Sequence, residues 1–180
     1  EIDNRIQLFS TGKNSGAAAA RNISLQNATG KYIAFLDSDD TWISNKLETQ
    51  IRFMEKNNIA FSFSTYSVMK EDGTPTGNII HAPKVIDYHG YLRNTIIGCL
   101  TVIIDKEKTG SFMMPNIKSS HDMALWLLIM KKGFKAYGLQ KTLANYRLVS
   151  TSNTAKKWKA AKDVWKVYRE IEHINPIYST

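Results

Sequence analysis

Cysteine, long apolar runs and the short signatures of common ligand sites are all scarce in this 180-residue sequence. A single cysteine, Cys99, excludes an internal disulfide, and a reducing compartment is the simpler expectation. No apolar stretch is long enough to cross a bilayer, and no signal peptide is recognisable. We therefore expect a cytoplasmic protein, with peripheral contact to the inner face of a membrane as a further possibility.

Sequence signatures of three frequent binding sites are also missing. The segment Gly12–Gly16 superficially suggests a phosphate-binding loop, but the Gly-Lys-Ser/Thr ending is absent. Neither a zinc-ligand spacing nor a dinucleotide fingerprint is found. Nucleotide binding, if present, must therefore use another arrangement.

Negative charge is the scarcer sign, with 24 Lys plus Arg against 16 Asp plus Glu and a net charge of +8. This balance favours anionic partners, namely nucleotide phosphates, acidic lipid surfaces or nucleic acid. The apolar fraction of 43% and the charged fraction of 22% are typical of a globular domain. Because no internal repeat or linker is visible, we expect residues 1–180 to form a single domain.

Short apolar runs alternate with amphipathic stretches along the first half, which predicts an α/β layer fold. The run Tyr32–Leu36 is apolar throughout, as in a strand buried on both faces of a parallel sheet. Ser15 and Ser44 are expected to cap the helices that follow them. The expected strands are Arg5–Phe9, Tyr32–Leu36, Ile59–Val68, Gly98–Ile104, Phe134–Tyr137 and Leu143–Tyr146. The expected helices are 17–28, Ser44–Asn57, His121–Lys132 and 155–173, and Glu71–Gly77 is expected to be a loop.

A dense carboxylate cluster, Asp37, Asp39 and Asp40, follows the apolar run. Carboxylates this close repel one another unless a cation lies among them, and Mg²⁺ and Mn²⁺ prefer oxygen ligands. Ligands of open α/β sheets bind beyond the carboxyl ends of strands, which is where the cluster is expected. The alternative is a solvated acidic turn that precedes a helix.

A longer pattern surrounds this cluster. It consists of Ala20-Arg21-Asn22, Ala28–Asp40, Trp42, Lys46-Leu47-Glu48 and Gln50. This pattern resembles family 2 of the inverting glycosyltransferases, which have the GT-A fold, and a looser match through Tyr146-Arg147 covers most of the chain. From Ser119 onward the chain is most similar to enzymes of bacterial surface-polysaccharide assembly, such as teichuronic-acid glycosyltransferases.

The resemblance implies a Rossmann-like GT-A sheet flanked by helices and a nucleotide-diphosphate sugar as donor, most commonly a UDP-sugar. In the family the Asp-x-Asp pair binds Mn²⁺ or Mg²⁺ with the donor's ribose and diphosphate, which implicates Asp37 and Asp39, with Asp39 the more direct metal ligand. Asp40 is then expected to lie next to these ligands without binding the metal directly. The residues expected near the nucleotide are Asn14, Gly16, Arg21, Asn22 and Arg147.

Two of these assignments have structural alternatives. Arg21 and Asn22 can instead lock their helix to the sheet. Free backbone N–H groups at the helix start, Ser15–Gly16, are suited to phosphate. Arg147, with Ser150 and Ser152 beyond it, resembles a late family motif whose loop closes over the diphosphate; the alternative is an exposed arginine at a strand end.

Inverting transfer needs a base that takes the proton of the acceptor hydroxyl. The family supplies it from a Glu-Asp pair at a helix start, and Asp122 takes this position. His121 replaces the glutamate, which leaves the role of that position open, and as a metal ligand it is disfavoured because hard cations prefer oxygen. The alternative for Asp122 is that it only complements the dipole of its helix.

The predicted last helix is basic and aromatic. Its apolar face suits either packing on the domain or an anionic membrane surface, where tryptophans lie in the interface. A membrane contact would fit a saccharide or lipid-linked acceptor, and no nucleic-acid partner is expected. The residues of the face, at spacings of three and four, are Trp158, Ala161, Trp165, Tyr168 and Ile171.

The elements that open the family's domain are not found: a first strand with a Pro-x-Tyr-Asn-like turn, and a second with an Asp-Asp-x-Ser motif. We therefore expect a catalytic domain whose N-terminal strands are missing. Two other functions stay open. One is a nucleotidyltransferase that makes a nucleotide sugar, against which the Asp37–Gln50 pattern argues; the other is a non-catalytic membrane or nucleic-acid binding module, supported by the basic helix alone.

Overall fold

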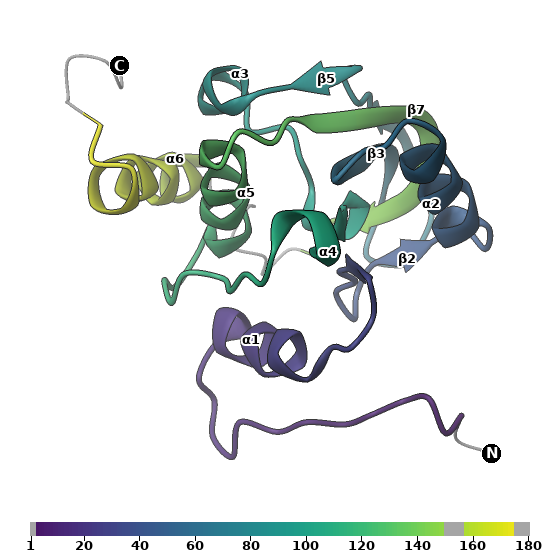
Figure 1. Ribbon diagram of the computed structural model, residues 1–180, viewed down its shortest axis with the longest axis horizontal. Coiled ribbons are helices and arrows are strands. Elements are labelled where there is room, and N and C mark those ends of the chain that lie inside the picture. The colour runs from purple at the N-terminus through teal and green to yellow at the C-terminus, as the bar shows by residue number, and fades with distance from the viewer. Residues whose placement is uncertain (1–2, 150–156, 175–180) are drawn as a thin grey trace.

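The computed structural model describes residues 3–149 and 157–174, and it combines one mixed sheet with helices on both of its faces (Figure 1). The strands are β1 Tyr32–Ala34, β2 Thr41–Trp42, β3 Phe61–Met69, β4 Pro75–Ile80, β5 Val85–Ile86, β6 Ile103–Asp105 and β7 Ala136–Arg147. The helices are α1 Ala17–Asn27, α2 Lys46–Lys56, α3 Tyr88–Arg93, α4 Lys106–Thr109, α5 His121–Lys131 and α6 Lys157–Lys166. A 3₁₀ turn, η1, covers Cys99–Thr101, and a π-helical turn, Val167–Ile171, follows α6.

The strand order places the carboxyl ends of three strands at one edge. The order is β1-β6-β3-β7-β2, with β4 beside β3 and β5 beside β7. β3 and β7 pair in parallel, and β6 runs antiparallel to both β1 and β3. β1, β3 and β7 therefore point the same way and end at the edge where an α/β sheet binds its ligands.

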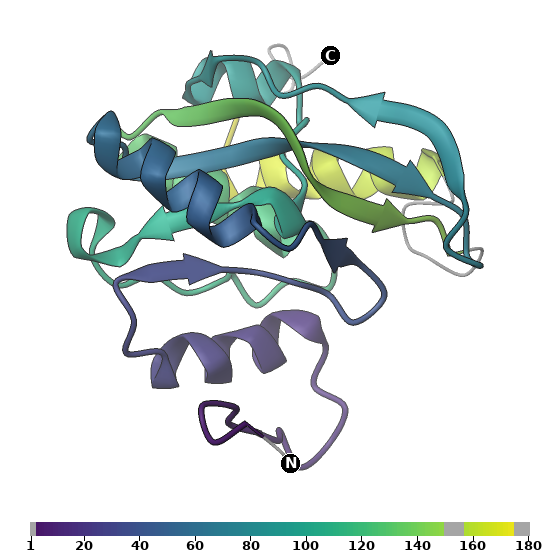
Figure 2. The ribbon, with the colours of Figure 1, turned by 90° about the vertical axis from the view of Figure 1, so that its right-hand side faces the viewer.

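Each face of the sheet has its own apolar layer. Ile103 packs with Met54 of α2, whereas its neighbour Ile104 belongs to the main core on the opposite face. This alternation follows from the two-residue period of a strand. Trp126 of α5 is fully buried in the main core and packs on Phe35 and Phe61, with ring centroids 5.6 and 5.4 Å apart. Figure 2 shows α2 lying across the sheet on the side facing the viewer.

The predicted α/β class is confirmed, and so are the strand at β3 and the helix at α5, whose starting residue is the predicted one. Two helix caps are wrong. α2 begins after Asn45, not Ser44, and α1 begins after Gly16, which has φ 83°, a conformation that glycine adopts without strain.

Five strand predictions need correction. Arg5–Phe9 pairs with no strand among the described residues and is exposed. β1 is antiparallel to its partner β6, so the predicted parallel pairing of Tyr32–Leu36 is wrong. Gly98–Ile104 is a 3₁₀ turn followed by a short strand. The two predicted strands after Gly133 are one strand, β7, because register shifts near Thr65 of β3 accommodate the polar residues between them.

The C-terminal helix packs differently from the predicted face. Val167, Tyr168 and Ile171 contact the core, whereas Ala161 is exposed and Trp165 is 39% exposed. The wider π-helical turn after Lys166 shifts the helical period, so a face counted at spacings of three and four does not stay on one side. The predicted start of the helix, Ala155, lies outside the described residues, and so do Ser150 and Ser152. Among the residues described, no helix has the length and apolar character needed to span a membrane.

Candidate active site

A cleft of about 1040 Å³ opens at the edge where β1, β3 and β7 end. Its walls come from the start of α1, the loop after β1, turn η1, the start of α5 and the end of β7. The cleft brings together four predicted site residues that are far apart in the sequence, Gly16, Arg21, Asp37 and Asp122, with the neighbouring Asp40 and His121. The predicted residues Asp39 and Arg147 are not among the residues that line it.

Arg21 connects the carboxylate cluster to the start of α5. Its guanidinium donates to Asp37 Oδ1 and to Nε2 of His121. Because arginine only donates, the imidazole must accept at Nε2 and is therefore neutral there. Burial lowers the pKa of His121, which agrees with the neutral form. Arg21 therefore bridges Asp37, after β1, and His121, at the start of α5, and holds the two segments in a fixed relation.

Arg147 ties the other end of the cluster to the sheet. Its backbone N–H donates to Asp40 Oδ1 at 2.8 Å, and its guanidinium donates to the carbonyls of Asp39 (2.6 Å) and Glu71 (2.8 Å). Burial, together with the charges of Asp39 and Asp37, raises the pKa of Asp40 to about 6 against the lowering effect of the Arg147 bond. Arg147 therefore fixes the cluster's loop, and phosphate contact by this residue stays a prediction.

The carboxylates suit a divalent cation only together with a second source of oxygen ligands. Among residues 3–149 and 157–174, no three His, Cys, Asp or Glu side chains are gathered as a complete metal site. Asp37 and Asp39 are partly or fully exposed, and Asp40 is buried beside them, with its pKa raised by burial first and then by their negative charge. Magnesium is commonly held by one or two carboxylates plus substrate phosphates. The donor set therefore fits a cation that arrives with a diphosphate.

Asp122 lies in the first turn of α5 and faces the same cleft. The residue before the helix, Ser120, has φ 57°, a left-handed conformation that costs a non-glycine residue about 1 kcal/mol and is typical of functional sites. Four residues further along α5, Trp126 packs on Phe35, which precedes Asp37 by two positions. This aromatic contact fixes the helix start that carries Asp122 relative to the strand end that carries Asp37.

Asn14 and Asn22 hydrogen-bond to the backbone of the protein instead of lining the cleft. Asn14 Oδ1 accepts the N–H of Gly16 at 3.2 Å, which shapes the turn before α1. The amide of Asn22 exchanges two hydrogen bonds, of 2.9 and 2.8 Å, with the backbone of Met114. These bonds support the structural alternative for Asn22, and a nucleotide contact by either asparagine stays a prediction.

Sequence reasoning missed part of the cleft wall. The missed residues are Tyr66, Glu71, the segment Gly98–Leu100 and Lys118–Ser120. For most of them the sequence carries no signal, because tertiary contacts bring them to the cleft. Leu100 is an exception, because its carbonyl accepts the indole N–H of Trp42 at 2.8 Å and Trp42 belongs to the family pattern.

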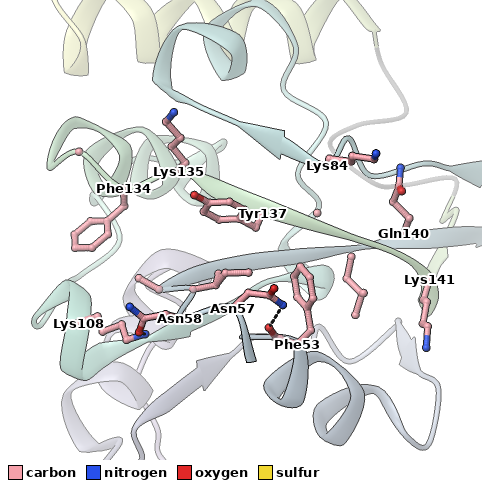
Figure 3. Close-up of a pocket in the computed structure, with 15 residues that line it drawn as sticks. Phe53, Asn57, Asn58, Lys84, Lys108, Phe134, Lys135, Tyr137, Gln140 and Lys141 are labelled. Carbon is pink, nitrogen blue, oxygen red and sulfur yellow. Dashed lines mark hydrogen bonds between the residues drawn. The ribbon is translucent and has the colours of Figure 1, made fainter. Parts of the chain in front are cut away.

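A second groove, of about 1210 Å³, lies at the opposite edge near the amino ends of β3 and β7 (Figure 3). No carboxylate lines it. Its lysines, Lys84, Lys108, Lys135 and Lys141, come from separate elements and point in different directions (Figure 3). Although this groove is larger, it lacks convergent polar groups, so the cleft at the carboxyl ends is the candidate active site.

A mixed α/β sheet with a carboxylate-bearing cleft at its strand ends fits the class of GT-A glycosyltransferases. Comparison with known sequences gives the family: the profile "Glycosyl transferase family 2" matches residues 1–115. The chain belongs to glycosyltransferase family 2, which confirms the resemblance. The matched range ends before Asp122, so the role of Asp122 stays a proposal.

Curated proteins that are similar to this chain are also named as glycosyltransferases. "Putative teichuronic acid biosynthesis glycosyltransferase TuaG" of Bacillus subtilis (strain 168) is 54% identical, over 100% of this chain and 71% of its own length. From Escherichia coli, "UDP-Glc:alpha-D-GlcNAc-diphosphoundecaprenol beta-1,3-glucosyltransferase WfgD" is 41% identical, over 92% of this chain and 64% of its own length. The surface-polysaccharide type predicted from the sequence is thereby confirmed, and the chain spans about two thirds of these relatives.

Solved structures confirm the fold. S. aureus TarS 1–349 in complex with UDP-GlcNAc has a TM-score of 0.62 and 17% identity, over 87% of this chain and 46% of that chain. The same protein in complex with UDP has a TM-score of 0.56 and 14% identity, over 86% of this chain and 52% of that chain. At this identity the likeness shows the GT-A fold.

Proposed function

We propose that this glycosyltransferase moves a sugar from a nucleoside diphosphate donor, UDP first among the candidates, to a saccharide or lipid-linked acceptor of a surface polysaccharide. The observation that carries the proposal is the single cleft that holds Asp37 on one wall and Asp122 on another. UDP and UDP-GlcNAc in the TarS structures and the diphosphoundecaprenol in the name of WfgD support the donor and acceptor classes.

Asp122 is the proposed base. An acceptor hydroxyl attacks the anomeric carbon from the face opposite the nucleotide, so the new C–O bond forms as the bond to the diphosphate breaks. The electron pair leaves with the nucleoside diphosphate, and the hydroxyl proton passes to the carboxylate of Asp122. Attack from the opposite face inverts the anomeric configuration.

Asp37 and Asp39 are the proposed ligands of a divalent cation, Mn²⁺ or Mg²⁺, together with the donor's diphosphate. When bound, such a cation stabilises negative charge on the leaving diphosphate. Arg21 holds Asp37 in orientation through its ion pair, and Arg147 holds the backbone of Asp39. The first turn of α1, after Gly16, directs its backbone N–H groups toward an anion at the cleft.

The donor site is tested by titrating UDP into the protein with and without Mn²⁺, beside Asp39→Ala. We expect binding that requires the metal and is lost in Asp39→Ala. Glu48→Ala is the matched control, because Glu48 is an exposed carboxylate on α2 outside the cleft. Binding that is equal in Asp39→Ala and the wild type would overturn the metal assignment, and no binding of UDP under any condition would overturn the choice of nucleotide.

A lipid-linked acceptor also makes a peripheral membrane contact part of the proposal, at the cytoplasmic face. Trp165 is 39% exposed, and Lys162 and Lys166 are exposed on the same helix, α6. Sedimentation with anionic and with zwitterionic vesicles tests the contact. Binding to anionic vesicles that falls in Trp165→Ala supports it, and equal sedimentation with both vesicle types contradicts it.

A further inference from the structure

A lysine and a glutamine lie fully buried behind the cleft, where no charge is expected. Lys46 and Gln50, one turn apart on α2, both have 0% of their surface exposed. Lysine is almost never fully buried without a partner of opposite charge. Among residues 3–149 and 157–174 this lysine has no such partner: Nζ donates to Gln50 Oε1 at 2.5 Å and to the Thr101 carbonyl at 3.2 Å, and it lies 5.2 Å from the centroid of the Trp42 ring.

All of these contacts converge on turn η1. Gln50 Nε2 donates to the Thr101 carbonyl at 2.9 Å and to Ser62 Oγ at 3.1 Å. Trp42 Nε1 donates to the Leu100 carbonyl at 2.8 Å. A buried carbonyl without a donor is costly, so three side chains from β2 and α2 supply the donors that two consecutive carbonyls of the turn require.

The other side of the same turn is a wall of the cleft. Gly98, Cys99 and Leu100 line the cleft together with Asp122. The Cys99 thiol is close enough to Asp122 and Arg21 for their charges to act on its pKa, which burial raises. Donors behind the turn therefore determine the shape of the surface that faces the proposed base.

We propose that Trp42, Lys46 and Gln50 are positioning residues that hold the Gly98–Thr101 turn as the wall contacted by the transferred sugar. They act through the turn and touch no substrate. The part of the proposal that concerns the sugar rests on the proposed function, whereas the part that concerns the turn does not. The burial of an uncompensated lysine is explained if its ammonium is needed as a donor to the turn.

Cys99 provides a reporter, because it is the only cysteine in this sequence and lies in the turn. The experiment measures the rate at which a small maleimide labels Cys99 in the wild type, Lys46→Met and Trp42→Phe, with Cys99→Ser as the blank. Trp42→Phe keeps a ring and removes the indole donor. Lys56→Met is the matched control, because Lys56 is exposed at the other end of α2.

We expect Cys99 to be labelled about fivefold faster in both variants, because the loss of one net hydrogen bond makes local opening of the turn easier by about that factor. The control should be labelled at the wild-type rate. Unfolding in urea is measured in parallel. Wild-type labelling rates in Lys46→Met and Trp42→Phe would overturn the proposal. So would acceleration that matches the loss of global stability, because the opening would then be global. If Lys46→Met does not fold, Trp42→Phe alone decides.

Binding of two probes separates positioning from the proposed function. With Mn²⁺ present, UDP and UDP-GlcNAc are titrated into each variant. We expect an unchanged dissociation constant for UDP and an approximately fivefold weaker one for UDP-GlcNAc, because the turn lines the cleft beside Asp122, the proposed base, and is proposed to contact the sugar. Faster labelling with no binding of either nucleotide, even to the wild type, would support the positioning of the turn and contradict the proposed function. Equal weakening of both ligands would contradict the assignment of the wall to the sugar.

Discussion

Replacing Lys46 by methionine is predicted to change stability in opposite directions at pH 7 and pH 10.5. Burial lowers the pKa of Lys46 from its ordinary 10.5 to about 7, and no carboxylate contributes to that shift. Between pH 7 and pH 10.5 the unfolded chain holds more protons at this residue than the folded chain. Wild-type stability therefore rises with pH across this window, and below pH 7 the full cost of burying the charge persists.

The magnitude follows from the two pKa values. The difference between 10.5 and about 7 corresponds to about 5 kcal/mol when the lysine is charged in both states. Methionine removes this cost but also removes the donor to Gln50 and Thr101, a loss of about 2 to 3 kcal/mol. Lys46→Met should therefore be more stable than the wild type by about 2 kcal/mol at pH 7 and less stable by a similar amount at pH 10.5.

Urea unfolding of the wild type, Lys46→Met and the exposed control Lys56→Met, at both pH values, measures the change. Groups other than Lys46 titrate alike in the three proteins, so the difference between Lys46→Met and the wild type isolates the buried lysine. If Lys46→Met were destabilised equally at pH 7 and pH 10.5, the reasoning would be refuted, because burial would then not lower the pKa of Lys46.

Two further predictions concern the frame of the cleft. Trp126→Ala should lower the free energy of unfolding by about 3 to 5 kcal/mol in urea, because it empties the fully buried site between Phe35 and Phe61; a loss below about 1 kcal/mol would mean that this packing does not fix α5. Arg21→Lys keeps a positive charge but cannot bond to Asp37 and His121 together, so Mn²⁺-dependent UDP affinity should fall about tenfold, as when a neighbour of a metal ligand is lost. Unchanged affinity in calorimetric titration would contradict the orienting role of Arg21.

Secondary structure was predictable where the local pattern was strong. β3 alternates aromatic and aliphatic residues with serines, as in a strand, and α5 is largely apolar, and both were found close to the expected bounds. β4 was missed because Pro75 and Gly77 are typical of a loop. The two-stranded prediction for the chain after Gly133 failed because residues 140–142 are polar, and only pairing with β3 makes β7 continuous.

The candidate site was predictable only in part, for a physical reason. The spacing of Asp37, Asp39 and Asp40 indicates a cation site by itself, whereas the assignment of Asp122 as the base came from the resemblance and stays a proposal. The pairing of Arg21 with His121 depends on a contact across 100 residues, which no local pattern contains. Lys46 and Gln50 look like solvated positions of a surface helix, and the available signal was their place in the family pattern beside Trp42.

Turnover by Asp122→Asn tests the central claim most directly. The assay follows release of UDP from a UDP-sugar in the presence of a lipid-linked saccharide acceptor, with Mn²⁺, and UDP binding is measured on the same samples. Loss of the base should lower turnover at least about a hundredfold while the affinity for UDP stays at the wild-type value. Wild-type turnover in Asp122→Asn would contradict the account, because the cleft would then carry out transfer without the carboxylate at the start of α5.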